Sequence, residues 1–343
     1  MNINLLEALE QLEEEKNISK EEVFKILEKA LLSAYRKNFG RTGNVEIVIN
    51  RMTGEIEVYQ ILEVVEKVED PATQIDLEEA QKIDFKAKIG DKVKKKLNVK
   101  KFGRIAAQTA KQVLIQKIRE IEKDNLYKQY LNMVRTVVTA EVIRVSQNFA
   151  DIRVGKLETR LLRKEMIPSE ELKVGDFIKV YITDIKRKGK GPVIMVSRRV
   201  PELILGLLKL EIPEVDDGTV EVVKIAREAG VRSKVAVKSN NPLVDPVGAC
   251  IGEGGARINS IMKELKGERI DVIKWADDPR EFIANALSPA SVVDVQILNE
   301  EEKSSRVYVS PTQLSLAIGK GGQNVRLAVK LTGWKIDVKP LMK

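Results

Sequence analysis

A glycine-rich stretch occurs twice in this chain of 343 residues, and it constrains the fold more than any other feature. The two copies are Ile251-Gly-Glu-Gly-Gly255 and Ile318-Gly-Lys-Gly-Gly322. Matching segments flank them: Ser233–Val237 and Ser305–Val309 on the N-terminal side, and Arg269–Val272 and Lys335–Val338 on the C-terminal side. One unit of strand, helix, glycine loop, helix and strand is therefore present twice in tandem.

Several kinds of site use a glycine-rich loop that opens a helix, because glycine admits a ligand close to the backbone and helix N–H groups face phosphate. A dinucleotide fingerprint has a third glycine, where this chain has Arg257 and Asn324. A P-loop has Gly-Lys followed by Ser or Thr, whereas Gly321 follows Lys320 here. A tight helix–helix turn and the GXXG of KH domains, which clamps a single-stranded nucleic-acid backbone, both remain. Two copies with matching flanks favour the KH domain.

The order of elements in each repeat supports the same interpretation. Residues 201–277 and 278–343 each read as helix, strand, strand, helix, glycine loop, helix and strand. The order α-β-β-α-α-β is that of the type II, or prokaryotic, KH fold. Because only the short joint Asp277-Asp-Pro279 separates the units, we expect them to pack as one block with a continuous RNA track.

Residues 132–200 show short strands and turn signals without a helical period, as expected for a small β-barrel. Strand alternation in 149–154 and 177–184 points one apolar set inward. The opposite sets hold three aromatic rings and two cations, which suit base stacking and phosphate neutralisation. Alternatively, one or two of the rings close the mouth of the barrel. A basic loop, Lys186–Lys190, follows. The candidate RNA contacts here are Phe149, Arg153, Phe177, Lys179 and Tyr181.

Residues 1–131 are expected to form an α/β domain. Leucines at helical spacing within 5–12 and the capping box Ser19-Lys-Glu-Glu22 predict two helices, and Val45–Val65 predicts a hairpin. A basic run, Lys94–Lys101, precedes an uninterrupted helical stretch from about Gly103 to Leu131. This long helix is a core helix of the first domain, a rigid connector to the barrel, or each in one half.

Charge is distributed unevenly within a formal net charge of +8. Residues 1–80 carry 9 Lys and Arg against 18 Asp and Glu, whereas residues 81–131 carry 15 against 5. The contrast suggests different partners for the two segments, although a charge run can also be a solvated face.

Several classes of protein are disfavoured. The chain has no histidine and one cysteine, which removes His-based acid–base catalysis and His-containing or four-thiolate zinc sites. The aspartates at 216–217 and 277–278 suit turns and caps better than a metal site. No apolar run approaches a membrane span, and the N-terminus has no signal-peptide pattern. We therefore expect a cytoplasmic protein that is not an enzyme and that has no cofactor, no metal and no membrane contact.

Longer motifs resemble the NusA family of bacterial transcription elongation, pausing and termination factors. Phe102–Val113 resembles the signature of that family's N-terminal domain. Asp245–Gly252 resembles its first KH module, and Leu314–Ala328 resembles its second. Residues 132–200 resemble the OB-fold domain, first named from ribosomal protein S-one, that the family has at this position. The likeness spans the chain in family order, without the acidic C-terminal repeats of some members.

The resemblance implies a multidomain α+β architecture: an N-terminal polymerase-binding domain with its connector helix (1–131), an OB-fold barrel (132–200) and two type II KH domains (201–277 and 278–343). It implies docking on bacterial RNA polymerase, capture of nascent single-stranded RNA, and effects on elongation, pausing, intrinsic termination and, with other Nus factors, antitermination. By position in the matching segment, Lys100, Lys101 and Arg104 are candidate polymerase contacts. We expect a monomer when the protein is free.

The glycine loops supply the remaining candidate RNA contacts. Glu253 in the first loop should repel phosphate and leave Arg257 as the nearest cation, whereas the second loop has Lys320 with Arg326 one turn later. We therefore expect the second unit to carry more of the backbone affinity. The candidates are Gly252, Glu253, Gly254, Gly255, Arg257, Gly319, Lys320, Gly321, Gly322 and Arg326.

Two other functions remain open. An accessory subunit of an RNA-processing enzyme could combine the same modules, although polynucleotide phosphorylase places KH before OB and behind catalytic domains that residues 1–131 do not resemble. A ribosome-associated RNA chaperone could use the modules without polymerase. Polymerase binding by the N-terminal region distinguishes the chaperone.

Overall fold

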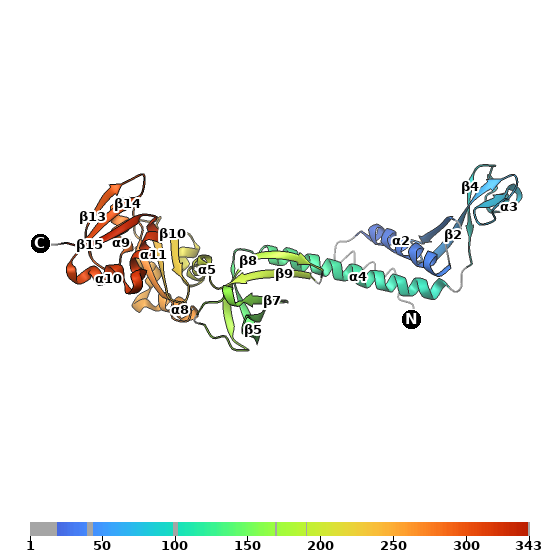
Figure 1. Cartoon of the computed structure of the whole chain (residues 1–343). Helices are drawn as coiled ribbons and strands as arrows, with labels where there is room; N and C mark the ends of the chain where they lie inside the picture. Colours follow the sequence, from blue (N-terminus) through green and yellow to red (C-terminus); the bar gives the residue numbers. More distant parts are fainter. Residues whose placement is uncertain (1–18, 40–43, 99–101, 169, 190, 342–343) are drawn as a thin grey trace. The chain divides into compact units, whose positions relative to one another are not determined.

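The computed structural model describes residues 19–39, 44–98, 102–168, 170–189 and 191–341, which form two compact units, 1–125 and 126–343 (Figure 1). The helix predicted within residues 5–12 lies outside the described residues. None of the described helices has the length and hydrophobicity that a membrane span requires.

The first unit contains the predicted hairpin covered by helices. Helix α2 (Lys20–Phe39) is followed by β1 (Asn44–Ile49), which pairs antiparallel with β2 (Ile56–Val65). Buried side chains of α2, the hairpin and the first half of α4 (Phe102–Leu131) share one core. Its aromatic centre is formed by Tyr35, Phe39 and Phe102.

The basic run contributes a strand to this unit. β2 also pairs in parallel with β3 (Gln74–Asp76) and antiparallel with β4 (Lys92–Lys96), and α3 (Leu77–Ile83) lies between these two strands in the chain. Asp76 caps α3, since its carboxylate accepts the Glu79 N–H at 2.8 Å. Lys94 and Lys96 pair with Glu46 and Glu57 of the hairpin. The acidic hairpin therefore neutralises part of the basic run.

Helix α4 has an apolar face in each of its halves. Ala106, Ala110 and Leu114 are buried in the core of the first unit. In the second unit, Leu126, Tyr127 and Tyr130 pack against the core of the barrel. The first half of α4 thus belongs to the core of the first unit, and the end of the helix packs on the barrel within the second unit.

The barrel has five strands in the order β7-β6-β5-β8-β9. The end strands β7 and β9 lie together, where Thr159 Oγ1 donates to the Ile194 carbonyl at 2.6 Å. The predicted inward sets are buried, among them Ile152 and Val180, so strand alternation is confirmed. The strands are β5 (Val137–Val145), β6 (Phe149–Val154), β7 (Leu157–Leu162), β8 (Phe177–Lys188) and β9 (Gly191–Ser197), with a 3₁₀ turn η1 (Arg163–Glu165).

Both KH modules have the predicted order of elements, and in each the first two strands are antiparallel and the last two parallel. The first contains α5 (Pro201–Glu211), α6 (Pro213–Asp216), β10 (Val220–Glu228), β11 (Arg232–Ser239), α7 (Pro246–Ile251), η2 (Glu253–Gly255), α8 (Ala256–Glu264) and β12 (Arg269–Lys274). The second contains α9 (Pro279–Ala286), β13 (Val292–Asn299), β14 (Ser304–Val309), η3 (Pro311–Gln313), α10 (Leu314–Ile318), η4 (Lys320–Gly322), α11 (Gln323–Thr332) and β15 (Lys335–Pro340).

The second module covers the outer face of the first module's sheet. Ala226, Ala236 and Ile273 on that face share a core with α9 and α11. Lys234 is buried beside them, and its Nζ donates to Asp271 at 3.0 Å and to the Ser288 carbonyl of the second module at 2.7 Å. The two KH modules therefore pack together, as the short joint between them predicts.

The second sheet differs at the matching positions. Where the first module has Lys234, Ala236 and Ile273, the tandem repeat places Arg306, Tyr308 and Lys339 in the second. The cross-strand ion pair recurs, since Arg306 Nε lies 3.1 Å from an oxygen of Asp337, but here both side chains are about 40% exposed. The apolar outer face of the first sheet thus becomes polar in the second.

A buried arginine joins the barrel to the first KH module. Arg198, fully buried after β9, donates through Nε to Glu170 of the barrel at 2.8 Å. Its Nη1 donates to the Glu264 carboxylate at 2.9 Å and its Nη2 to the Glu264 carbonyl at 3.0 Å. Glu264 lies at the end of α8 and also accepts the Lys179 N–H of β8 at 2.9 Å. The side chain of Arg198 thus forms hydrogen bonds with both the barrel and the first KH module.

The same junction requires a glycine in α5. A Cβ on Gly206 would lie 2.1 Å from Cγ2 of Val137 in β5. We expect Gly206→Ala to lower the free energy of unfolding by about 1–3 kcal/mol, although alanine is the better helix former by about 1 kcal/mol. Urea unfolding checks this result. Adding Val137→Ala should restore most of the loss, and a stabilised single variant would contradict the close approach.

Candidate nucleic-acid interface

The two glycine loops have the same backbone conformation. Gly252 and Gly319 end the preceding helices with φ of 75° and 76°. The last glycines, Gly255 and Gly322, open α8 and α11 in the left-handed region, with φ of 79° and 74°. Because L side chains rarely adopt this conformation, both ends of each loop favour glycine. The two copies of the repeated sequence thus adopt the same backbone conformation.

The first glycine of each loop also packs against the following helix. A Cβ on Gly252 would lie 2.7 Å from Cγ of Arg257, and one on Gly319 would lie 2.8 Å from Asn324. The middle of each loop is open, since a Cβ on Gly254 or on Gly321 would meet nothing within 4 Å. A nucleic-acid backbone can therefore approach the middle of both loops.

The two loops carry side chains of opposite charge. Glu253 is exposed in the first loop, and Lys320 is exposed in the second. The side chains just before the loops, Ile251 and Ile318, are both 37% exposed and place apolar surface beside the glycines. The sequence analysis did not select these isoleucines, although their position in both repeats was a signal.

Arg257 is engaged in contacts within its own module. Its Nη1 donates to Glu214 of α6 at 2.8 Å and to the Ala249 carbonyl of α7 at 2.8 Å. The guanidinium thus braces the helix before the loop against a neighbouring helix. Its charge is paired with Glu214 of its own module, whereas the sequence predicted it as the nearest cation for phosphate.

Arg326 is also engaged within the protein. Its Nε donates to Glu228 of the first module at 2.7 Å, and its Nη1 donates to the Gly321 carbonyl at 3.1 Å. The hydrogen bond from this guanidinium lowers the pKa of the Glu228 carboxyl. Arg326 therefore connects the second loop to the first KH module, where the sequence predicted a phosphate ligand.

On the barrel, β6 presents a ring that is flanked by arginines of the neighbouring strands β5 and β7. The guanidinium carbon of Arg160 lies 3.7 Å from the centroid of Phe149, and that of Arg144 lies 5.4 Å away. Both arginines bond Asp151, and the hydrogen bond from Arg160 is the main cause that lowers the pKa of this carboxyl. Sequence reasoning missed Arg144 and Arg160, whose proximity depends on strand pairing. The predicted Arg153 lies on the same outer side and pairs with Glu141 and Glu158.

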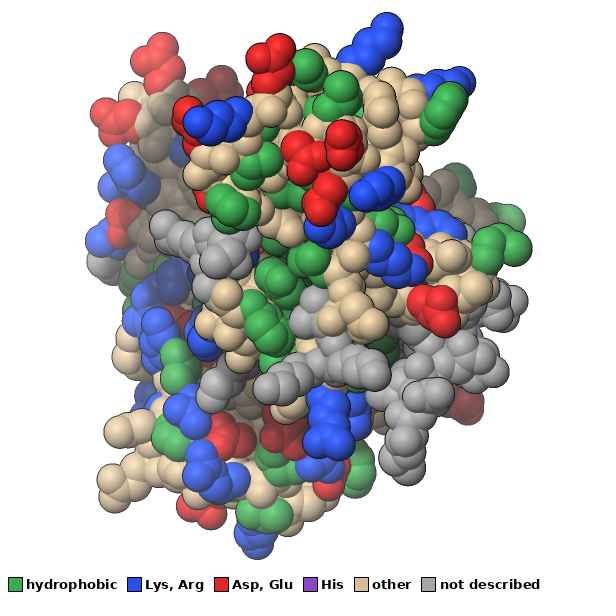
Figure 2. Space-filling view, turned by 90° about the vertical axis from the view of Figure 1, so that its right-hand side faces the viewer, with side chains coloured by type: hydrophobic (Ala, Val, Ile, Leu, Met, Phe, Trp, Pro, Cys, Tyr) green, Lys and Arg blue, Asp and Glu red, His purple; other side chains and the backbone are tan. Residues whose placement is uncertain are grey.

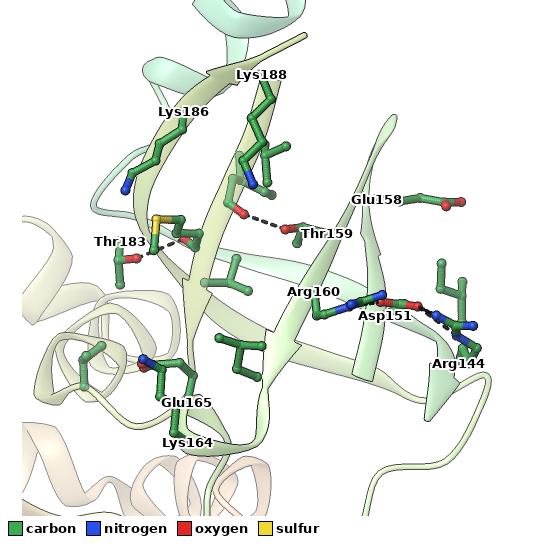
Figure 3. Close-up of a pocket in the computed structure, with 17 residues that line it drawn as sticks. Arg144, Asp151, Glu158, Thr159, Arg160, Lys164, Glu165, Thr183, Lys186 and Lys188 are labelled. Atoms are coloured by element: carbon green, nitrogen blue, oxygen red, sulfur yellow. Dashed lines mark hydrogen bonds and ion pairs between the residues drawn. The ribbon is translucent and has the colours of Figure 1, made fainter. Parts of the chain in front are cut away.

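A groove of about 1160 Å³ adjoins this face along the seam between β7 and β9 (Figure 3). Figure 3 shows Lys186 and Lys188 extending from β8 on one side, and the row of Arg160, Asp151 and Arg144 on the other. Leu162 and Met195 add exposed apolar surface to its lining. The groove combines cations with apolar surface, as single-strand binding sites do.

The outward residues of β8 do not join Phe149, because β5 separates β6 from β8. Tyr181 packs against the core of the first KH module, and burial raises its pKa. Tyr181 is therefore partly covered by the first KH module, and it lies apart from Phe149 instead of forming one platform with it. Phe177 remains 71% exposed and, with Lys179, lines a groove of about 510 Å³ shared with α5 and α8. Lys179 Nζ donates to Thr139 Oγ1 at 2.8 Å.

Comparisons with known proteins cover nearly the whole chain. Family models match the NusA N-terminal domain at residues 4–124, the S1 RNA binding domain at 133–197, and NusA-like first and second KH domains at 198–275 and 279–343. The chain is 50% identical to the transcription termination/antitermination protein NusA of Bacillus subtilis, over 99% of this chain and 91% of the relative. The chain belongs to the NusA family.

More distant NusA proteins match over the same region. The protein of Thermus thermophilus is 43% identical, over 98% of this chain and 89% of its own length. That of Rickettsia prowazekii is 37% identical over 98% of this chain and 67% of its own length. The resemblance found in the sequence motifs is thereby confirmed, as is the assignment of an OB barrel and two KH domains.

The candidate polymerase contacts lie in the NusA N-terminal domain. Arg104 is exposed in the first turn of α4, whereas Lys100 and Lys101 lie outside the described residues. In the view of Figure 2, basic and acidic side chains of the described residues are interspersed with apolar ones. Two lysines of β4, Lys94 and Lys96, are paired with carboxylates of the hairpin.

Proposed function

We propose that this protein is an RNA-binding transcription factor that docks on bacterial RNA polymerase through residues 1–131 and captures nascent single-stranded RNA through residues 132–343. It thereby modulates elongation, pausing, intrinsic termination and, together with other Nus factors, antitermination. Its role is to bind rather than to catalyse, it acts in the cytoplasm, and it is a monomer when free. Its domains meet at 131/132, 200/201 and 277/278.

The observation that carries this proposal is the pair of matching glycine loops in one compact unit with an OB barrel, in a chain of the NusA family. Each loop is open at its middle glycine, so bare peptide can face a nucleotide backbone. In the second loop Lys320 adds the cation that offsets phosphate charge, whereas Glu253 opposes it in the first. The affinity of the second loop is accordingly the greater.

Two barrel surfaces complete the RNA contacts. On the first, Phe149 offers a ring for stacking, and the lysines of the adjoining groove face the phosphates. On the second, Phe177 and Lys179 lie between the barrel and the first KH module, in a groove that Lys263 and Lys266 also line. An RNA strand bound on the second surface would contact the barrel and the first KH module at once.

Polymerase binding is tested with the full chain and purified bacterial RNA polymerase. We expect saturable binding by the full chain and by residues 1–131, with RNA binding by residues 132–343 independent of polymerase. Arg104→Glu should weaken polymerase binding about tenfold by reversing one contact charge. Arg119→Glu is the matched control, because Arg119 is exposed on the same helix.

Two outcomes would contradict parts of the proposal. If neither the full chain nor its fragment bound polymerase, the transcription role would be lost, and a general RNA-binding protein such as an RNA chaperone would remain. If Arg119→Glu weakened polymerase binding as much as Arg104→Glu, the contact assigned to Arg104 would be wrong.

A further inference from the structure

One carboxylate of the first KH module contacts the glycine loop region of the second. Glu228 ends β10, and its side chain is only 20% exposed. Its Oε1 accepts Arg326 Nε at 2.7 Å, and its Oε2 accepts Arg326 Nη2 at 3.2 Å and Gln323 Nε2 at 3.0 Å. Lys330 lies 3.9 Å away on the same helix. Three side chains along α11 thus converge on one group of another module.

The contact continues into the loop itself. Arg326 Nη1 donates to the Gly321 carbonyl at 3.1 Å, while the same guanidinium is held by Glu228. Gly321 has φ of 60° and open space around it, so packing alone does not fix its orientation. Glycine loses more conformational freedom on ordering than any other residue. A hydrogen bond to its carbonyl therefore reduces the entropy that binding must otherwise remove.

The first loop is held in a different way. In the tandem repeat Asn259 stands where the second module has Arg326, and Ala256 stands where it has Gln323. The brace of the first loop is Arg257, which bonds Glu214 and the Ala249 carbonyl within its own module. A brace across the module boundary is thus specific to the second loop.

We propose that Glu228 is a positioning residue for RNA binding by the second glycine loop: it fixes Arg326, which holds the Gly321 carbonyl and presets the loop. The inference rests on the proposed binding of RNA by this loop. It makes the second loop dependent on the first module, so the tandem binds as one preorganised site.

The test is Glu228→Gln in the full chain, with Glu221→Gln as the matched control. Glu221 lies on the same strand and pairs with Lys238 within its own module. We expect Glu228→Gln to weaken binding of a single-stranded RNA oligonucleotide about tenfold, because a charge-assisted hydrogen bond becomes a neutral one. The control should change affinity less than twofold. An unchanged or increased affinity for Glu228→Gln would overturn the proposal, since Glu228 would then be inert or a competitor of phosphate.

A double-mutant cycle shows whether Glu228 acts through the second loop. In a Gly322→Asp background, Glu228→Gln should have no further effect on RNA affinity. In a Gly255→Asp background, it should keep its full effect. Equal effects in both backgrounds would mean that Glu228 supports the module junction in general, and the proposed role would be wrong.

A measurement without RNA separates this inference from the proposed function. Hydrogen exchange at the amides of Gly321 and Gly322 should accelerate in Glu228→Gln, whereas exchange at Gly254 and Gly255 should not change. If the wild-type chain failed to bind RNA, the proposed function would fail on its own, and the exchange data would still decide whether Glu228 orders the loop. Unchanged exchange at the second loop would overturn the positioning role.

Discussion

Replacing Arg198 by alanine is expected to lower the free energy of unfolding of the second unit by about 3–5 kcal/mol. The variant leaves Glu170, which is fully buried, without its charged partner, and it removes both contacts to Glu264. An uncompensated buried carboxylate costs far more than an exposed one, because water cannot solvate it. We expect a corresponding separation of the barrel from the first KH module.

Urea unfolding of the full chain, followed together with hydrogen exchange of amides in β8 and α8, checks this expectation. Arg199→Ala is the control, since Arg199 is adjacent but exposed; its effect should stay within about 0.5 kcal/mol. A loss for Arg198→Ala no greater than that of the control would show that the junction does not depend on the ion pair.

Gly322→Asp is expected to weaken binding of single-stranded RNA on the order of 10- to 100-fold. A side chain at Gly322 meets no atom within 4 Å, so the substitution does not create a clash. It places a negative charge beside Lys320, where phosphate is proposed to lie, and forces a non-glycine residue to a φ of 74°. Gly255→Asp should cost less, because the first loop already carries Glu253.

Fluorescence anisotropy with a labelled oligonucleotide provides the comparison. Gly322→Asn separates the two causes, because asparagine tolerates the left-handed conformation and carries no charge. We expect the asparagine variant to retain most of the affinity. If Gly255→Asp weakened binding more than Gly322→Asp, the order of importance given to the two loops would be reversed.

The repeat and the strand alternation were sufficient to predict the fold of the second unit. Both are local patterns: GXXG fixes a helix–loop–helix, and alternation at Ile152 and Val180 fixes which side of a strand is buried. Patterns that span a few residues were predicted correctly because they depend on the local backbone geometry of those same residues.

The roles of individual cations were less predictable, because they depend on segments far apart in the chain. Arg326 is 98 residues from Glu228, its partner in another module. Tyr181 was placed outside the barrel by alternation, yet the outer side of β8 faces the first KH module. Nothing local to Arg198 indicated full burial either. Arg326 and Tyr181 thus contact other modules in ways that the sequence analysis did not anticipate.

The outer faces of the two KH sheets differ in polarity, and this difference has a consequence for fragments of the protein. The first module leaves Ala226, Ala236 and Ile273 uncovered unless the second is present. The second ends in a surface of Arg306, Tyr308 and Lys339 that can face water. In a repeat array the polar member is the terminal cap. Truncation after residue 277 should therefore expose this apolar face and yield a fragment that aggregates.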